Sequence, residues 1–287
     1  MSTRSSNRNN DHMVMQPTDG ISIVNESKDR SISRHTGALI VNADDWGHDR
    51  ITTNRTAECI DRGAISSVSA MVFMEDSARA AELACERGID AALHLNLTAP
   101  FTAPGVPAGL VEHQRRLSAY LLEHRYAQTI FHPALVNSFE FAVAAQLAEF
   151  VRLWGTEPRR IDGHHHMHLC LNVLLGKLLP GGTVVRRNFS FEPGEKSWLN
   201  RLYRRVLDRA LEHRHRLADF LFSLTPLDPP ARLGKIFSLA CEFAVEVETH
   251  PVNPIEYQFL TGGDIFRWAG DTPVACGYVV RGEEAAQ

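Results

Sequence analysis

The chain has 287 residues, of which 44% are hydrophobic and 22% are charged, and its formal net charge is −4. A chain of this length and composition can bury a full hydrophobic core, as one large domain or two small ones. Its basic residues are dispersed, so the sequence lacks the basic stripe of a nucleic-acid-binding protein. We find no uninterrupted apolar stretch long enough to cross a bilayer, and no apolar signal-peptide core near the N-terminus.

The five cysteines are an odd number, lie far apart and form no C-x-x-C pair. Cysteines in this pattern are typical of reduced, mostly buried thiols rather than of a disulfide framework. We therefore expect a globular protein of the cytoplasm, with no nucleic-acid partner and no transmembrane segment.

The first 36 residues are rich in Ser, Asn, Arg and Asp and poor in aromatic residues. A segment of this composition cannot bury enough apolar surface to offset the entropy lost on ordering. We expect residues 1–36 to be a disordered leader and the folded part to begin at Gly37.

From Gly37 onward, apolar runs alternate with amphipathic segments that end at glycine. The apolar runs are predicted to be strands, at 38–41, 65–74 and 90–97. The segments 51–62 and 77–87 are predicted to be helices. This alternation of strand and helix indicates a parallel α/β sheet.

Residues 99–136 contain several prolines and show no clear period. They predict a long surface excursion, typical of a lid or a substrate-binding insertion. Regularity returns at Asn137, where Asn137 and Glu140 have the spacing of a capping box, and a helix is predicted to continue to Trp154.

In the C-terminal half, residues 171–179 are predicted to form a short helix, and 183–187 and 243–248 to form strands. The basic stretch 201–216 interleaves arginines with Leu, Val and Ala. This pattern predicts an amphipathic helix with a solvated face rather than a binding arm.

Four histidines and an aspartate lie within the seven residues 162–168, directly after a predicted strand. Imidazole is the commonest protein ligand for a divalent metal, and packed imidazoles repel one another when protonated, so the cluster favours a bound cation. The alternative is a polar, partly solvated loop that is rich in histidine. The internal position and the interrupting Met167 exclude a purification tag.

Polar residues also end two other predicted strands. Asp44 and Asp45 follow the first strand, and His94 lies in the third with Asn96 on the same face. Carboxyl ends of parallel strands are where α/β folds place their sites. Each feature has a structural alternative: the aspartates as a helix N-cap, His94 as a core histidine, and His250 as a turn residue. Their coincidence at successive strand ends favours a site.

Four blocks of the sequence together resemble the YdjC/ChbG carbohydrate deacetylases, a family that includes hopanoid-associated members. The blocks occur in the family's order, between residues 37 and 262. They are Ile40-Val41-Asn42-Ala43-Asp44-Asp45-Trp46-Gly47, Leu93-His94-Leu95-Asn96-Leu97-Thr98, Ile161-Asp162-Gly163-His164-His165-His166-Met167-His168 and Glu246-Val247-Glu248-Thr249-His250-Pro251.

The resemblance implies a distorted (β/α) barrel, similar to a TIM barrel and built from parallel strands, as a single domain over residues 37–287. It implies Asp45, His94 and His164 as metal ligands, Asp44 as the catalytic base and His250 as the catalytic acid. Further residues would face the substrate or support the ligands: Trp46, Asn96, His165, His166, His168, Arg186 and Glu246.

The same resemblance implies removal of the acetyl group from an N-acetylated sugar, an N-acetylglucosamine-type oligosaccharide or a glycolipid, to give a free amine and acetate. Two imidazoles and a carboxylate suit one divalent ion, Zn²⁺ or, with more water, Mg²⁺. The sequence departs from the family at Trp46, where Phe is usual, and at Val252, where Gly is usual.

Two alternatives remain at this point. A metal-dependent phosphoesterase or amidohydrolase on a similar barrel would use the same ligands, with Arg186 and Arg187 as the cations for phosphate. A non-catalytic relative would keep the metal site without turnover. A homodimer is compatible with the sequence.

Overall fold

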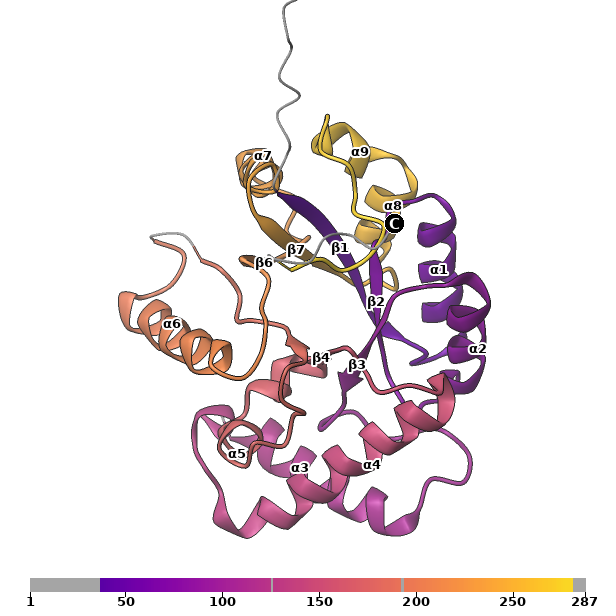
Figure 1. Ribbon diagram of the computed structural model, residues 1–287, viewed down its shortest axis with the longest axis vertical. Coiled ribbons are helices and arrows are strands. Elements are labelled where there is room, and N and C mark those ends of the chain that lie inside the picture. Colours follow the sequence, from indigo (N-terminus) through magenta and orange to yellow (C-terminus); the bar gives the residue numbers. More distant parts are fainter. Residues whose placement is uncertain (1–36, 125, 192–193, 281–287) are drawn as a thin grey trace, which may run out of the picture. The chain divides into compact units, whose positions relative to one another are not determined.

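The computed structural model describes residues 37–124, 126–191 and 194–280 (Figure 1). The leader expected at residues 1–36 lies outside the described residues. The body that begins at Gly37 contains a seven-stranded sheet with helices packed around it.

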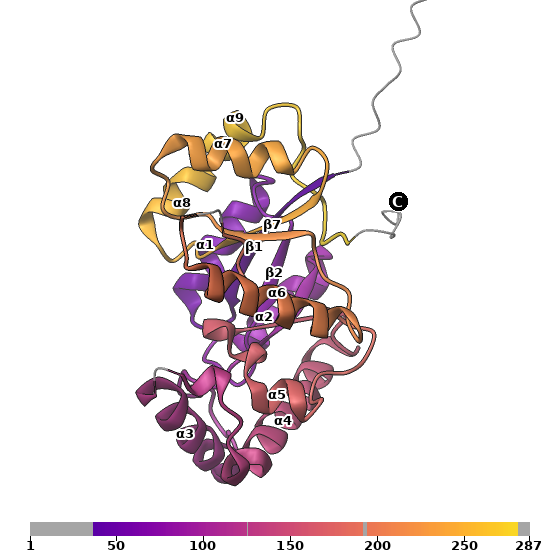
Figure 2. The same ribbon diagram turned by 90° about the vertical axis from the view of Figure 1, so that its left-hand side faces the viewer.

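All strand pairs of the sheet are parallel, and their order is β5-β4-β3-β2-β1-β7-β6. The sheet curls into a half-barrel (Figures 1 and 2), which confirms the expected α/β distorted barrel. The strands are β1 (Ala38–Trp46), β2 (Ser67–Ala70), β3 (Ala91–Leu95), β4 (Arg160–Gly163), β5 (Val184–Val185), β6 (Phe220–Ser223) and β7 (Ala244–Thr249).

The chain that follows β5 meets the opposite edge strand of the sheet. The backbone N–H of Ser190 donates to the carbonyl oxygen of Leu221 in β6 at 2.8 Å. An isolated parallel bridge also joins Val184 of β5 to Arg216, just before β6. The ends of the open sheet are therefore connected by main-chain hydrogen bonds, and Arg186, directly after β5, reaches side chains of β7.

Most predicted helices are present. They are α1 (Arg50–Asp61), α2 (Ser77–Arg87), α4 (Val136–Trp154), α5 (Leu171–Leu175) and α6 (Trp198–Glu212). The remaining helices are α3 (Ala108–Glu123), α7 (Pro230–Leu239), α8 (Pro254–Thr261) and α9 (Asp264–Ala269), with 3₁₀ turns η1 (Ala127–Thr129), η2 (Pro133–Leu135) and η3 (His164–Leu169). Strands β1 and β3 lie in the core and bury Leu39, Val41, Leu93 and Leu95 completely.

The prediction that residues 99–136 lack regular structure was wrong, because this segment contains the 16-residue helix α3. Its buried face is formed by Leu110, Gln114, Leu117 and Leu121, which recur every three or four residues. The glutamine hides the helical period, because its buried amide donates to the carbonyl oxygen of Ala99 rather than contributing an apolar side chain.

The predicted capping box was also wrong. Helix α4 begins at Val136 with Leu135 as its N-cap and has no side-chain cap, so Asn137 lies inside the helix. The segment Pro133–Trp154 is long and apolar enough, by length and composition, to cross a membrane. Its side chains Phe139, Val143 and Phe150 are buried in the core cluster, as in a core helix of a globular domain.

Candidate metal centre and active site

A bulge at the end of β1 brings two neighbouring aspartates to the same side of the sheet. Between Ala43 and Trp46 the strand advances three residues, while β2 advances two, from Val68 to Ala70. Asp45 takes up the extra residue in the left-handed region, with a φ of 64°. Aspartate is one of the few residues that visit this region readily. Strict alternation would have turned the two carboxylates to opposite faces.

Asp45, His94 and His164 converge from β1, β3 and the turn that follows β4. Asp45 Oδ1 lies 2.9 Å from His164 Nδ1 and 3.4 Å from His94 Nε2. One ligand atom of each residue lies within 4.8 Å of the others, which is the spacing of donors that share a cation. The N-cap of α1 is Asp49, so the alternative in which Asp44 and Asp45 cap this helix is wrong.

A carboxylate behind His94 orients its ring. Asp162 Oδ1 lies 2.7 Å from His94 Nδ1, which leaves Nε2 directed at Asp45. Burial lowers the pKa of His94, but the carboxylates of Asp44, Asp162 and Asp45 outweigh burial and raise the pKa to about 10. The site therefore strongly favours a positive charge at this place, and the carboxylate–histidine arrangement is the one that orients metal-binding imidazoles.

Charge also keeps Asp45 ionised. Burial alone raises its pKa, but hydrogen bonds from His164 and His94 hold the pKa of Asp45 well below its usual range. An ionised carboxylate with two imidazoles on three rigid elements is a donor set that fits a divalent cation with open positions for water or substrate.

Asp44 lies beside this trio but is bound differently. Its Oδ1 accepts from Arg186 Nη2 at 2.7 Å and from Asn42 Nδ2 at 2.8 Å. Its Oδ2 accepts from Arg186 Nη1 at 2.6 Å and lies 3.8 Å from His94 Nε2. Burial alone raises the pKa of Asp44. The charges of Arg186 and His94 outweigh burial and lower the pKa below its usual value, so the carboxyl is ionised.

Arg186 is the centre of a buried ionic network. Besides Asp44, its guanidinium contacts Glu246 at 2.7 Å, Asp162 at 3.2 Å and Glu248 at 3.3 Å. Burial disfavours the charged guanidinium, but the carboxylates outweigh burial and raise the pKa of Arg186 well above its usual range. The network holds more carboxyls than cations, so burial and Asp44 raise the pKa of Glu248 well above its usual range.

Glu248 and His250 complete the side of the site formed by β7. An imidazole nitrogen of His250 and carboxylate oxygens of Asp44 and Glu248 lie within 4.8 Å of one another. The backbone N–H of His250 donates to the carboxylate of Glu256, whose other oxygen accepts from Thr225. Val252 is outside the positive-φ region, so this turn accommodates valine where the family usually has glycine.

The four histidines of the cluster have different positions. His165 and His166 adopt left-handed backbone angles, with φ of 54° and 56°, so the stretch is not extended. His165 Nδ1 lies 3.0 Å from Thr98 Oγ1, and His166 Nε2 lies 3.3 Å from Glu248 Oε2. His168 is fully buried and turns away, and its Nε2 lies 2.9 Å from the carbonyl oxygen of Arg186.

Two other residues expected to face the substrate are buried in supporting positions. Asn96 accepts from the backbone N–H groups of Thr98 and Ala99, so it shapes the turn after β3. Trp46 is fully buried and donates from Nε1 to the carbonyl oxygen of Ala80 in α2 at 2.9 Å.

Several residues of the network did not receive a role from the sequence, because their importance depends on burial. They are Asp162, Glu248, Glu256, Arg160 and Tyr278. Arg160 donates to Asn42 Oδ1 at 3.0 Å and lies over the ring of Tyr278, whose hydroxyl donates to Glu246. A buried charge has to be paired, so the acidic Glu246-x-Glu248 pattern was the available signal.

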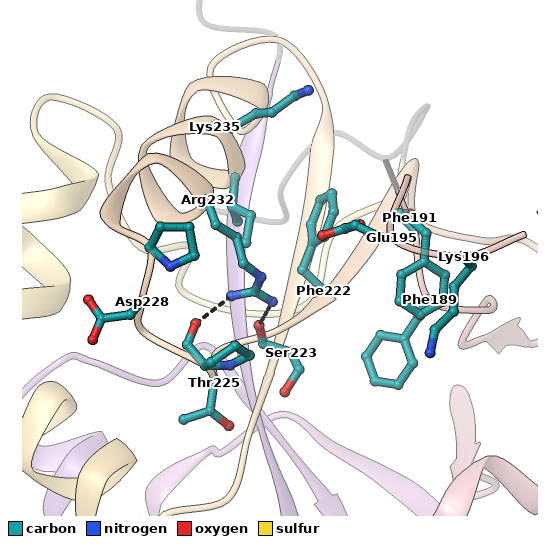
Figure 3. A pocket seen from close by; sticks show the side chains of 14 residues that line it. Phe189, Phe191, Glu195, Lys196, Phe222, Ser223, Thr225, Asp228, Arg232 and Lys235 are labelled. Atoms are coloured by element: carbon teal, nitrogen blue, oxygen red, sulfur yellow. Dashed lines mark hydrogen bonds between the residues drawn. The ribbon is translucent and has the colours of Figure 1, made fainter. Parts of the chain in front are cut away.

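A pocket of about 470 Å³ adjoins the site (Figure 3). Phe189 lines it and packs its ring against His166, with 4.5 Å between ring centroids. Thr225, on the opposite side, is the residue that binds Glu256. Figure 3 shows Phe189 and Phe191 together on one wall and Arg232 pointing to the end of β6, where it donates to the carbonyl oxygen of Ser223.

The sequence resembles characterised relatives over part of its length. It is 32% identical over 132 residues to a chitooligosaccharide deacetylase of Serratia marcescens, a match that spans 46% of this chain and 50% of the relative. A protein of the same name from Proteus mirabilis is 30% identical over 131 residues, with the same coverage. The chain thus spans about half the length of the curated relatives it matches.

Structural and family comparisons cover more of the chain. A solved structure from Enterococcus faecalis, described as a "putative cellobiose-phosphate cleavage protein", superposes with a TM-score of 0.58 at 18% identity, covering 84% of this chain and 97% of the other. This likeness supports the fold. The family model described as YdjC-like protein matches residues 38–251. These residues contain Asp45, His94 and His164, together with Asp44, Asp162, Arg186, Glu248 and His250, and the chain belongs to the YdjC-like protein family.

Proposed function

We propose that the protein is a metal-dependent hydrolase that removes the acetyl group from an N-acetylated sugar and releases a free amine and acetate. The observation that carries this proposal is the placement of an ionised Asp44, held by Arg186, directly beside the donor trio of Asp45, His94 and His164. The relatives named chitooligosaccharide deacetylase support the choice of substrate.

Asp45, His94 and His164 would hold one divalent cation, Mg²⁺ or Zn²⁺. When bound, such a cation polarises an amide carbonyl and lowers the pKa of water. The protein's own contribution is to fix the three donors on β1, β3 and η3, with Asp162 behind His94. Side chains held by rigid elements and by supporting hydrogen bonds need little reorganisation during the reaction.

Asp44 is proposed as the general base. Its Oδ1 accepts two hydrogen bonds, whereas Oδ2 accepts one at hydrogen-bonding distance and faces His94. Oδ2 is therefore the oxygen that takes a proton from the attacking water. Arg186 keeps the carboxylate ionised and fixes its plane, because a bidentate pair constrains orientation as well as charge.

His250 is proposed as the general acid, which donates a proton to the departing amine. An amide nitrogen leaves poorly without a proton, so an acid is needed within reach of the departing amine. The hydrogen bond from the His250 backbone N–H to the Glu256 carboxylate fixes the position of the His250 backbone, from which the imidazole extends. His165 and His166 would face the substrate, while Glu246, His168, Asn96 and Trp46 would support the residues that do.

The decisive experiment compares metal content and acetate release in two variants. Asp44→Asn is expected to retain the metal and lose turnover, whereas His164→Ala is expected to lose both. The substrates are N-acetylglucosamine oligomers and a glycolipid that carries N-acetylglucosamine. Full activity in either variant would overturn the assignment. Absence of activity of the native protein on all of these substrates would favour a non-catalytic relative.

The phosphoesterase alternative receives no support from the two arginines that suggested it. Arg186 donates to carboxylates, and Arg187 donates to the carbonyl oxygen of Ala218 and to Asp208. Release of phosphate from a phosphorylated sugar, measured in the same assay series, separates this alternative from the deacetylase. The five cysteines are unpaired, which supports a reducing compartment, and we place the reaction in the cytoplasm.

A further inference from the structure

Helix α6 exposes a stripe of large apolar side chains to solvent. Trp198 is 65% exposed, Leu199 60% and Val206 61%, and Leu202 and Tyr203 are exposed beside them. Figure 2 shows α6 in front of the sheet, with one side of the helix turned outward. Singly exposed apolar residues are common, but five on one short helix form a patch that marks an interaction surface.

The exposed stripe is distinct from the face that packs on the protein. Leu207, Asp208 and Leu211 are buried and hold α6 to the domain. Trp198, Leu202 and Val206 follow one another at intervals of four residues on the outward side. Within the described part of the chain, the outward side is not covered by another element. The predicted amphipathic helix is present, and its solvated side carries these apolar side chains as well as arginines.

Arginines form the next row of the same helix. Arg201, Arg205 and Arg209 also recur every four residues beside Trp198, Leu202 and Val206. Arg205 and Arg209 are exposed, whereas Arg201 is half-buried and lines a cavity with Asp208. Two acidic residues lie near them on the helix. Asp208 is buried and accepts from Arg187 and Asn188, and Glu212 is exposed three residues after Arg209. One row of side chains on the outward surface of α6 is therefore apolar, and the adjacent row carries a net positive charge.

The apolar surface continues from α6 to α5. A cavity of about 190 Å³ between the two helices is lined by Leu207 and Ala210 of α6 and by Leu174 and Leu175 of α5. Leu175 is 62% exposed at its edge, and Lys177 and Arg214 add positive charge there. The patch is thus broader than one helix, and cations surround it.

We propose that this surface docks on an anionic lipid membrane, with α6 lying in the plane of the interface. Apolar side chains with a tryptophan along one line and arginines along the next are the pattern of interfacial helices. Arginine heads bind lipid phosphates, while the apolar line enters the acyl boundary. The arginines favour an anionic membrane over a second copy of the chain, because in a dimer the two rows of arginines would repel each other. This inference does not depend on the proposed deacetylase activity.

The test is sedimentation of the full chain with vesicles of phosphatidylcholine alone or with phosphatidylglycerol. The protein is expected to bind the anionic vesicles and to dissociate from them as salt is raised. Substitution of Arg201, Arg205 and Arg209 by Gln is expected to weaken this binding on the order of a hundredfold. The double variant Trp198→Ala and Val206→Ala is expected to weaken it at least about tenfold.

Matched controls keep the test specific. Substitution of the exposed Arg62, Arg87 and Arg116 by Gln changes the net charge equally, and Ile51→Ala with Leu122→Ala removes exposed apolar groups elsewhere. Both controls are expected to bind as the native chain does, and circular dichroism reports whether each variant is folded. Absence of vesicle binding, or equal loss in variants and controls, overturns the proposal. So does self-association that α6 substitutions abolish without any vesicle binding.

Discussion

Arg186 holds Asp44 by two parallel hydrogen bonds, from Nη1 to Oδ2 at 2.6 Å and from Nη2 to Oδ1 at 2.7 Å. The two residues are 142 positions apart in the chain and meet only because β1 and the end of β5 face each other across the curled sheet. A guanidinium fixes both the ionisation and the plane of a carboxylate that it binds in this way. The proposed base is therefore positioned from the far side of the half-barrel.

Arg186→Lys tests this positioning. Lysine keeps the charge but cannot form two parallel hydrogen bonds, so the Asp44 carboxylate is free to rotate. We expect kcat for acetate release to fall about a hundredfold, as for other small misplacements of a reacting group, with KM nearly unchanged. Steady-state kinetics measures both values. Arg79→Lys, at the bidentate contact with Asp76 outside the site, is the control. A normal kcat in Arg186→Lys would contradict the positioning role.

Asp162→Asn tests the orientation of His94. The carboxylate contacts His94 Nδ1 at 2.7 Å, and an amide can present its N–H there and favour the wrong tautomer. We expect divalent-metal affinity to fall by about 10- to 100-fold, which is typical of such supporting residues. Isothermal titration with Zn²⁺ or Mg²⁺ measures the change, with Asp208→Asn as a buried control. If the metal affinity is unchanged, Asp162 does not orient the ligand.

His168→Gln is expected to change how stability depends on pH. Burial lowers the pKa of His168 to about 4, below the unfolded value of 6.5. The neutral ring therefore contributes stability above pH 6.5 that is lost as pH falls towards 4, on the order of 3 kcal/mol. Gln keeps a donor for the Arg186 carbonyl but does not titrate, so its unfolding free energy should change less across this window. Urea unfolding at several pH values measures the slope, with exposed His213→Gln as control.

Glu248→Gln is expected to act in the opposite sense. Burial, then Asp44, raises the pKa of Glu248 well above 4.5. A raised folded pKa means that stability present below pH 4.5 is lost as pH rises towards the folded value. The variant should therefore unfold at a higher temperature than the native chain at pH 8 and at a similar temperature near pH 4. Thermal melts with a chelator present measure this, and exposed Glu86→Gln should show no such crossover.

The sequence predicted the helices and strands in which apolar residues recur at regular intervals. Helices α1 and α2 and strands β1, β3 and β7 were found near their predicted positions, because Gly and buried apolar runs mark them. Helix α3 was missed because buried Gln114 interrupts its apolar stripe. Strand β6 was missed because its four residues, Phe220–Ser223, are too short to show alternation.

The candidate site was predictable in its residue types and less so in its contacts. The polar strand ends and the family resemblance named Asp45, His94 and His164, which the fold brings together. Side-chain alternation could not separate His164 from His168, since two left-handed residues lie between them. The roles of Asp162 and Glu248 depend on complete burial next to Arg186, which local sequence does not encode.

The bulge in β1 makes the spacing of the first strand part of the chemistry. Only Asp44 and Asp45 lie between Ala43 and Trp46, so a β1 that advanced two residues against two in β2 would have room for one carboxylate there instead of two. The pair of adjacent aspartates thus depends on the extra residue that the bulge accommodates at Asp45.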